Sequence, residues 1–132
     1  MNVAVLGASN KPERYSYQAV KLLAENGHRV FPVNPAMLAI DGVPAFKQLA
    51  DIPVPVHIVT VYLGPERSTA LLAPILAARP QWVIFNPGAE NLGAELKFRA
   101  AGIQVENACT LVLLRTGQFD LAMTATAGAE TR

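Results

Sequence analysis

The stretch VLGASNKPERYS, from Val5 to Ser16, decides the fold, because in it a short apolar run ends at a glycine and leads into a helical pattern. The run itself, Val3 to Leu6, is continuously apolar, which is typical of a parallel strand covered on both faces. Small and polar residues follow Gly7, and two cations, Lys11 and Arg14, precede the helical pattern. The stretch therefore predicts a first strand, a glycine turn and a first helix.

The same alternation continues along the chain. Ser16 is the predicted N-cap of a helix that Gly27 ends, and residues 29–33 form a second predicted strand. Later strands are predicted within 56–63, 82–85 and 103–105, with helices starting at Pro65, after Asn91 and at Cys109. Pro74 predicts a kink or break in its helix. Strands alternating with helices predict an α/β fold: a Rossmann-like, three-layer, doubly wound parallel sheet of five strands, with the first strand at its centre.

Length and composition indicate one globular domain. The chain has 132 residues, of which 52% are hydrophobic and 16% charged, and a net charge of +1. We assign residues 1–119 to the domain and predict a flexible C-terminal tail over 120–132, where apolar periodicity stops. The charge balance favours neither a nucleic-acid partner nor a membrane surface. A single cysteine, Cys109, and the lack of a leader segment predict a cytoplasmic protein.

The glycine turn has the chemistry of a phosphate site. Gly7 lets a ligand approach the backbone closely, and Ala8 and Ser9 are small. The following helix offers its positive N-terminus, while Arg14 and Lys11 add formal charge. Ligands of doubly wound sheets collect at the carboxyl ends of the strands, where the strand order reverses. That position favours a phosphate site over an ordinary turn with two solvated cations.

The residues alone leave the identity of the phosphorylated ligand open. A dinucleotide fingerprint needs G-x-G-x-x-G and an acidic residue at the end of the second strand, whereas this chain has only Gly7 and ends that strand with Val33-Asn34-Pro35. A Walker A loop is absent as well, because no G-K-[ST] occurs. Both departures weaken the alternative of an NAD(P)-binding redox protein.

Four motifs in order carry a resemblance to a known family. They are G-A-S-x-K-P-x-R-Y-S after the first strand, P-V-N-P after the second, N-P-G-x-E-N after the fourth, and residues 106–111 near the end. Together they resemble the small single-domain CoA-binding proteins, whose fold is similar to the CoA-binding domain of the succinyl-CoA synthetase alpha subunit and of ADP-forming acyl-CoA synthetases. The resemblance covers residues 1–119 and implies coenzyme A, or a short acyl-CoA, at the carboxyl edge of the sheet.

The resemblance also implies roles for particular residues. The predicted positions are Gly7, Ala8 and Ser9 along the diphosphate, Lys11 and Arg14 on phosphates, Val33, Asn34 and Pro35 beside the adenosine, and Asn86, Pro87 and Gly88 facing the pantetheine. Tyr15, which flanks the phosphate loop, either covers the ligand or packs in the core.

The cysteine and the two histidines of the chain form no pattern that is typical of a catalytic site. Cys109 is interpreted as a small buried residue at the start of the last helix, and His28 and His57 as structural or solvated. One cysteine and two scattered histidines form no metal-ligand pattern. We therefore expect a binding or regulatory module without its own catalysis. The alternative is a non-catalytic component of an NDP-forming acyl-CoA ligase that works with a separate protein partner. The sequence leaves open whether the chain forms a homodimer.

Overall fold

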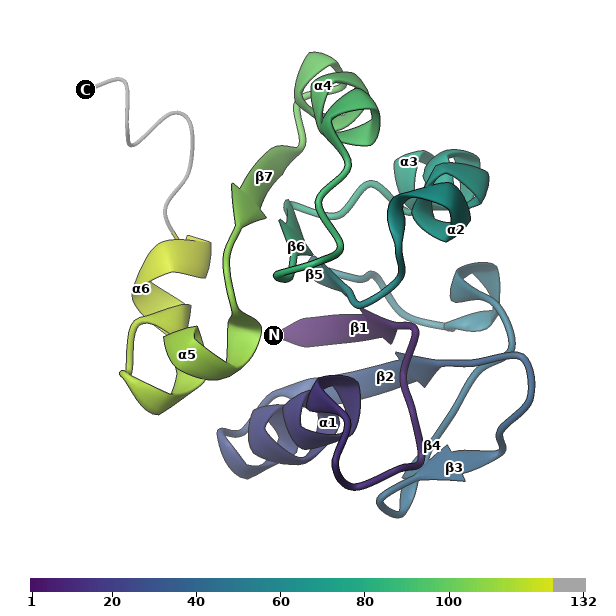
Figure 1. Cartoon of the computed structure of the whole chain (residues 1–132), viewed down its shortest axis with the longest axis vertical. Coiled ribbons are helices and arrows are strands. Elements are labelled where there is room, and N and C mark those ends of the chain that lie inside the picture. The colour runs from purple at the N-terminus through teal and green to yellow at the C-terminus, as the bar shows by residue number, and fades with distance from the viewer. Residues whose placement is uncertain (125–132) are drawn as a thin grey trace.

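Five parallel strands form the sheet at the centre of the molecule (Figure 1). The computed structural model describes residues 1–124. The strands are β1 (Asn2–Leu6), β2 (Arg29–Val33), β5 (Ile58–Val61), β6 (Trp82–Phe85) and β7 (Gln104–Asn107), in the spatial order β2-β1-β5-β6-β7. This confirms the predicted α/β, Rossmann-like sheet. The prediction that the first strand lies at its centre is wrong, because β1 has one strand on one side and three on the other, so that β5 is the middle strand.

Two helical layers cover the sheet, and the strand order reverses between β1 and β5. One face carries α1 (Tyr15–Glu25), α5 (Thr110–Arg115) and α6 (Phe119–Thr124), and the other carries α2 (Pro65–Ala70), α3 (Leu72–Ala78) and α4 (Leu92–Ala100) (Figure 1). Alternate residues of each strand enter opposite layers, as Val3 and Ala4 of β1 do. The carboxyl ends of β1 and β5 therefore meet at one edge, next to the loops that follow them.

Helix α1 begins at Tyr15, one residue earlier than predicted, with Arg14 as its N-cap. The predicted capping role of Ser16 is wrong, because Ser16 lies inside the first turn and is buried. No side chain caps this end of α1, and its first turn contains no acidic residue. The predicted cap of α4 is confirmed, since the Asn91 side chain accepts a hydrogen bond from the Ala94 backbone N–H at 3.1 Å.

The predicted break near Pro74 is confirmed and lies at Leu71, between α2 and α3. Proline has no backbone N–H, so Pro74 cannot donate the helical hydrogen bond to the carbonyl of Ala70. The chain between β2 and β5 forms a small hairpin, β3 (Ala39–Ile40) and β4 (Val43–Pro44), and a single turn of 3₁₀ helix, η1 (Leu49–Asp51).

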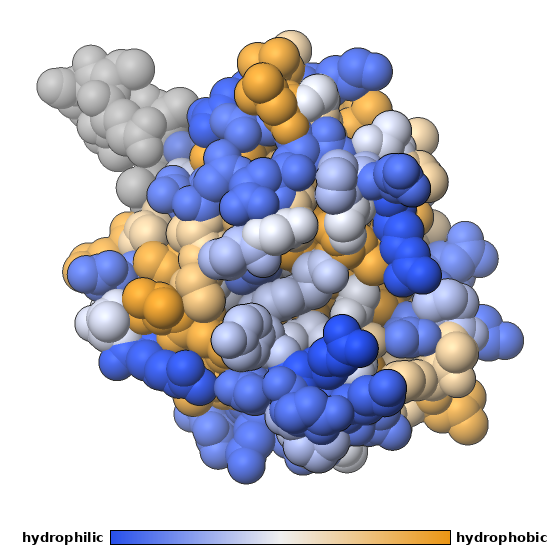
Figure 2. Space-filling view, viewed as in Figure 1, coloured by the Kyte–Doolittle hydropathy of each residue, from blue (hydrophilic) through white to orange (hydrophobic). Residues whose placement is uncertain are grey.

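The predicted tail is partly wrong. Residues 119–124 form helix α6, because Phe119 and Met123 lie four positions apart and are both almost fully buried against the α1 and α5 layer. Residues 125–132, the rest of the predicted tail, lie outside the described residues. Figure 2 shows hydrophobic side chains on the surface over α5 and α6 and at the outer end of α4, where the exposed Val112, Leu121, Leu92 and Leu96 lie.

Candidate functional site

A cavity of about 640 Å³ lies at the carboxyl edge of the sheet, where the strand order reverses. Its volume is within the range of small-molecule sites. Its lining comes from the loops after β1, β2 and β5, from the segment before and within η1, and from α2 and α3. The lining residues are Leu6, Gly7, Ala8, Ser9, Arg14, Val33, Asn34, Pro35, Lys47, Gln48, Leu49, Ala50, Tyr62, Leu63, Arg67, Ala70, Leu71 and Pro74.

Gly7 forms the turn at the floor of the cavity in a left-handed conformation, with φ +79°. A Cβ atom at this position would lie 2.8 Å from Cδ2 of Leu63 and 3.2 Å from the backbone carbon of Tyr62. The glycine is therefore required for close packing of the loop after β1 on the loop after β5. Close approach of a ligand to the backbone, which the sequence predicts at Gly7, would be a second reason for a glycine at this position.

Asn34 ties two of the cavity loops together. Its side-chain amide donates a hydrogen bond to the Ala8 carbonyl at 2.7 Å, and its side-chain oxygen accepts one from the Ala36 backbone at 2.8 Å. In the loop after β1, the Ser9 hydroxyl accepts a hydrogen bond from the Lys11 backbone N–H at 3.1 Å. These local bonds hold the backbone of the glycine turn in one conformation.

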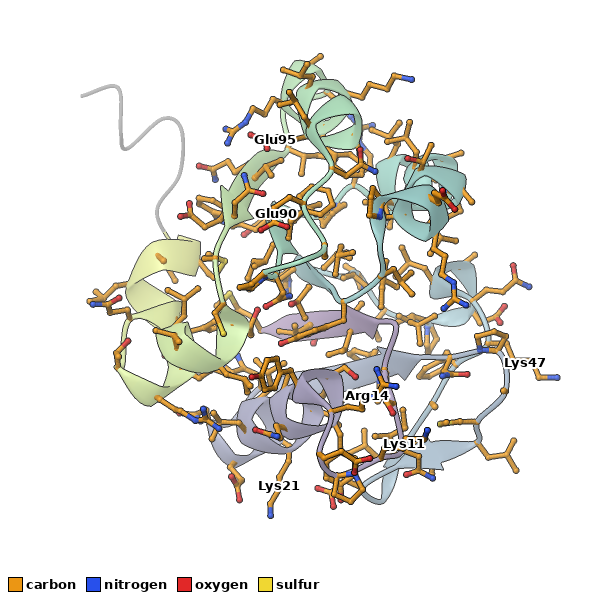
Figure 3. The ribbon with its side chains drawn as sticks, in the orientation of Figure 1. Lys11, Arg14, Lys21, Lys47, Glu90 and Glu95 are labelled. Atoms are coloured by element: carbon orange, nitrogen blue, oxygen red, sulfur yellow. The ribbon has the colours of Figure 1, made fainter. Side chains whose placement is uncertain are left out.

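Three cations line the cavity, namely Arg14, Lys47 and Arg67, and the described lining contains no carboxylate. They come from the loop after β1, from the segment after β4 and from α2, so the fold brings together cations that lie far apart in the sequence. In Figure 3, Arg14 lies near the centre of the view and the Lys47 side chain extends outward at the right edge. Since the whole chain has a net charge of only +1, the positive charge is local to this site.

Another part of the lining is apolar, with Leu49, Leu63 and Leu71 among its residues. Tyr62 contributes to the wall as well, and burial raises the pKa of its hydroxyl, which therefore stays protonated. A cavity that combines cations with an apolar wall suits an anion joined to a ring or chain of low polarity.

Asn86, predicted to face the pantetheine, is buried and is not among the residues that line the cavity. Its amide nitrogen donates to Thr60 Oγ1 at 2.7 Å and to the Val61 carbonyl at 3.0 Å, and its oxygen accepts from the Thr110 backbone at 2.9 Å. Both amide hydrogens are thus used within the protein. Asn86 joins β5 and β6 to α5, and nothing in its geometry supports a contact with a ligand.

Seven of the predicted residues line the cavity: Gly7, Ala8, Ser9, Arg14, Val33, Asn34 and Pro35. Five do not: Lys11, Tyr15, Asn86, Pro87 and Gly88. Lys11 and Tyr15 are exposed beside the glycine turn, and Pro87 and Gly88 are exposed in the loop after β6.

The cations Lys47 and Arg67 were not predicted as site residues. Both follow the ends of strands in the fold, but neither belongs to a motif that marks it. The signal that could have identified Arg67 is its place in the first turn of the helix that was predicted to start at Pro65, directly after a strand. Lys47 carries no comparable signal, because no strand was predicted before it.

The histidines and the acidic residues near α4 have structural partners away from the cavity, and Cys109, interpreted as buried, is only partly buried at the N-cap of α5. His28 and His57 precede β2 and β5, so they lie at the amino edge, and His57 Nδ1 accepts a hydrogen bond from the Asn2 backbone at 2.8 Å. Glu90 accepts a hydrogen bond from the Gly88 backbone, and Figure 3 shows both it and Glu95 on the α4 side, away from Arg14 and Lys47. A hydrogen bond from the Asn107 amide lowers the pKa of Glu95, and its contact with Arg99 lowers it further.

No group of three or more metal-ligating side chains occurs within residues 1–124. None of the helices found there is long and apolar enough to cross a membrane.

Comparison with known proteins agrees with this geometry. A family model described as a CoA binding domain matches residues 1–115. The chain belongs to this CoA-binding domain family. Among curated members of related sequence, the uncharacterized protein YneT of Bacillus subtilis is 35% identical over 65 residues, which are 49% of this chain and 48% of YneT.

The family resemblance extends to a ligase subunit. The alpha subunit of the ADP-forming acetate–CoA ligase II of Pyrococcus furiosus is 42% identical over 52 residues, which are 39% of this chain but only 11% of the subunit. Two solved structures share the fold. A Thermus thermophilus protein superposes with a TM-score of 0.82 at 33% identity, covering 89% of this chain and 90% of that one. The dinucleotide-forming acetyl-coenzyme A synthetase 1 of Ca. Korarchaeum cryptofilum has a TM-score of 0.70 at 20% identity, covering 81% of this chain and 25% of that one.

Proposed function

We propose that the cavity at the carboxyl edge of the sheet binds coenzyme A or a short acyl-CoA, and that the chain is a binding or regulatory module without its own catalysis. The observation that carries the proposal is the charge of the lining. Arg14, Lys47 and Arg67 surround a cavity whose described lining has no carboxylate, and coenzyme A has phosphates at two positions. The family to which the chain belongs supports the same ligand.

The diphosphate fits best against the glycine turn. The backbone of Gly7, Ala8 and Ser9 leads to the N-terminus of α1, an eleven-residue helix with neither a side-chain cap nor an acidic first turn. Its first N–H groups are therefore available to an anion, and the helix dipole favours negative charge there. Arg14, the N-cap residue, adds a guanidinium that can bind a phosphate with two hydrogen bonds.

The apolar part of the lining suits the less polar parts of the same ligand. Leu49, Leu63 and Leu71 offer surface to an adenine ring or to the pantetheine arm. Chemistry on a thioester would need a nucleophile with a base, and the described lining contains no histidine, cysteine or carboxylate. The composition of the site therefore favours binding over turnover.

Ligand binding is tested by calorimetric titration and by the thermal unfolding midpoint, with coenzyme A, dephospho-CoA, NADP⁺ and ADP. Coenzyme A is expected to raise the midpoint more than the others, because dephospho-CoA lacks the 3′-phosphate and NADP⁺ and ADP lack the pantetheine arm. At a ligand concentration 100 times Kd, the stabilisation is expected to be about 2.7 kcal/mol. Absence of any heat or midpoint shift with coenzyme A would contradict the proposal.

Replacing Arg14 by alanine is expected to weaken binding of coenzyme A about tenfold at low salt, since a charge-assisted hydrogen bond to phosphate is lost. The loss should shrink at high salt, where screening weakens the same attraction. Lys21→Ala is the matched control, because Lys21 is an exposed cation of α1 that does not line the cavity and points away from it in Figure 3. Equal affinities of the Arg14 variant and the wild type would exclude the assigned role.

The similarity to the Pyrococcus ligase subunit favours one second candidate, a non-catalytic component of an acyl-CoA ligase. Native mass spectrometry of the chain purified from its own cells distinguishes the two. A module predicts the mass of the chain with coenzyme A or an acyl-CoA, whereas a component predicts a stable complex with a second protein.

A further inference from the structure

The end of β2 forms the corner of the cavity where a ribose would lie. In doubly wound nucleotide-binding sheets, an acidic residue after the second strand accepts a hydrogen bond from a ribose hydroxyl, and a nearby cation accommodates a phosphate on the ribose instead. Here Val33, Asn34 and Pro35 line this corner of the cavity. The described lining of the cavity contains no carboxylate that would repel a ribose phosphate.

A later segment of the chain brings a cation to the same corner. Phe46 forms an isolated parallel bridge with Val33, in which the Asn34 N–H donates to the Phe46 carbonyl at 2.9 Å and the Phe46 N–H donates to the Pro32 carbonyl at 2.8 Å. Lys47 is the next residue and lines the cavity. The bridge therefore fixes the backbone of Lys47 beside the end of β2, although the sequence predicted no strand before Lys47.

The Lys47 side chain is free to bind an anion. It is exposed, and its ammonium makes no ion pair with any residue of the described part of the chain. Figure 3 shows the side chain extending outward at the right edge of the molecule, away from Arg14. A lysine ammonium is a point charge on a flexible stem, so it can turn onto a phosphate near the rim without a fixed geometry.

We infer that Lys47 binds a phosphate carried on the ribose, so that the site selects a ribose-phosphorylated adenine nucleotide over its dephosphorylated form. This inference rests on the proposed function and assigns the two anionic groups of the ligand to different parts of the site. The glycine turn and Arg14 hold the diphosphate at the end of β1, and Lys47 binds the second anionic group at the end of β2. Arg67 stands on the α2 side of the cavity.

The test is the ratio of two affinities, measured by calorimetric titration with coenzyme A and dephospho-CoA. The wild type is expected to bind coenzyme A roughly tenfold more tightly, as one charge-assisted contact allows. In Lys47→Gln the ratio should fall to near one, because coenzyme A weakens and dephospho-CoA does not. Lys21→Gln should keep the wild-type ratio, and Arg14→Gln should weaken both ligands by the same factor.

A second pair of probes separates the ribose phosphate from the rest of the ligand. Adenosine 3′,5′-bisphosphate and AMP differ only in the 3′-phosphate, so Lys47→Gln should remove the preference for the bisphosphate as well. NADP⁺ and NAD⁺ differ in a 2′-phosphate, and they show whether the cation serves the 3′ position of coenzyme A or a 2′-phosphate. Tighter binding of NADP⁺ than of coenzyme A would overturn the inferred ligand.

The outcomes distinguish the inference from the proposed function. If the wild type binds neither coenzyme A nor dephospho-CoA, the proposed function is wrong. If it binds both equally, or if Lys47→Gln weakens both equally, the proposed function stands and the inference about Lys47 is overturned. Since Lys47 is exposed, unliganded Lys47→Gln is expected to unfold at the wild-type midpoint, which shows that a lost preference is not a folding defect.

Discussion

Gly7 illustrates how one residue can serve both packing and binding. Replacing it by alanine is expected to destabilise the protein by about 2–4 kcal/mol, since the left-handed backbone strains an L-residue and the new Cβ meets Leu63 and the Tyr62 backbone. The measurement is urea unfolding followed by circular dichroism. Gly88→Ala is the control: φ is +89° there too, but nothing lies within 4 Å of the added Cβ, so only about 1 kcal/mol should be lost. Equal losses in the two variants would refute the packing role.

Asn86 is the residue at which the structure and the family resemblance lead to different expectations. Asn86→Ala is expected to cost about 2–4 kcal/mol, because the Val61 carbonyl, the Thr110 N–H and the Thr60 hydroxyl all lose a buried partner. The affinity of the folded variant for coenzyme A should stay within a factor of about two, since Asn86 does not line the cavity. A variant that keeps its stability but loses coenzyme A would restore the predicted contact with pantetheine.

Among the α-helices, α6 was not predicted from the sequence. Phe119→Ala is expected to destabilise the protein by about 2–4 kcal/mol, because the ring is almost fully buried and contacts His28 edge-on at a centroid distance of 5.1 Å. Leu121→Ala, two residues along the same helix, serves as the control: its side chain is 77% exposed and should matter little. Thermal unfolding of both variants gives the comparison. Equal midpoints would mean that α6 contributes nothing to the fold.

The elements that could be predicted are those whose signal is local. Trp82–Phe85 is an apolar run with the bounds of β6, and Asn91 and Pro65 mark the starts of their helices as predicted. The element with the weakest local signal is α6: its buried face consists of two residues within one helical turn, too short for a period to be recognised. The parallel bridge at Phe46 could not be predicted either, because it depends on where the hairpin returns the chain.

At the scale of the whole molecule, stability is expected to depend on pH through His28. Burial lowers the pKa of His28, and the Met1 ammonium 3.2 Å from its Nδ1 lowers it further, while Asp120 at 3.2 Å from Nε2 acts in the opposite direction. The folded state therefore favours the neutral ring. As pH falls below about 6.5, the unfolded chain takes up a proton that the folded chain resists, so the free energy of unfolding decreases towards the lowered pKa.

The check is a set of urea unfolding curves at pH 7.5, 6.5 and 5.5 for the wild type and for His28→Gln. The wild type should lose stability over this range more steeply than the variant, which has no titrating group at this position. Parallel slopes would show that another group dominates the pH dependence.

The candidate site could be predicted only where it coincides with the strand ends. Gly7 to Ser9 and Val33 to Pro35 follow predicted strands, so the doubly wound topology alone brought them to one edge. Asn86 follows a predicted strand too, yet its side chain turns into the protein, and strand position does not determine where a side chain points. Lys47 could not be predicted because its place depends on the path of the hairpin, which is a tertiary feature, whereas Arg67 lies in the first turn of the helix predicted at Pro65 and was missed.

The positions of the lining residues along the chain have a consequence for the evolution of this scaffold. Every described residue that lines the cavity lies between Leu6 and Pro74, whereas the later strands complete the sheet and the later helices cover it. The choice of ligand and the completion of the scaffold are therefore encoded in separate, consecutive parts of the sequence. A chimera that joins the first part of this chain to the second part of a relative is expected to keep the ligand preference of this chain, while its free energy of unfolding should depend strongly on the relative's part.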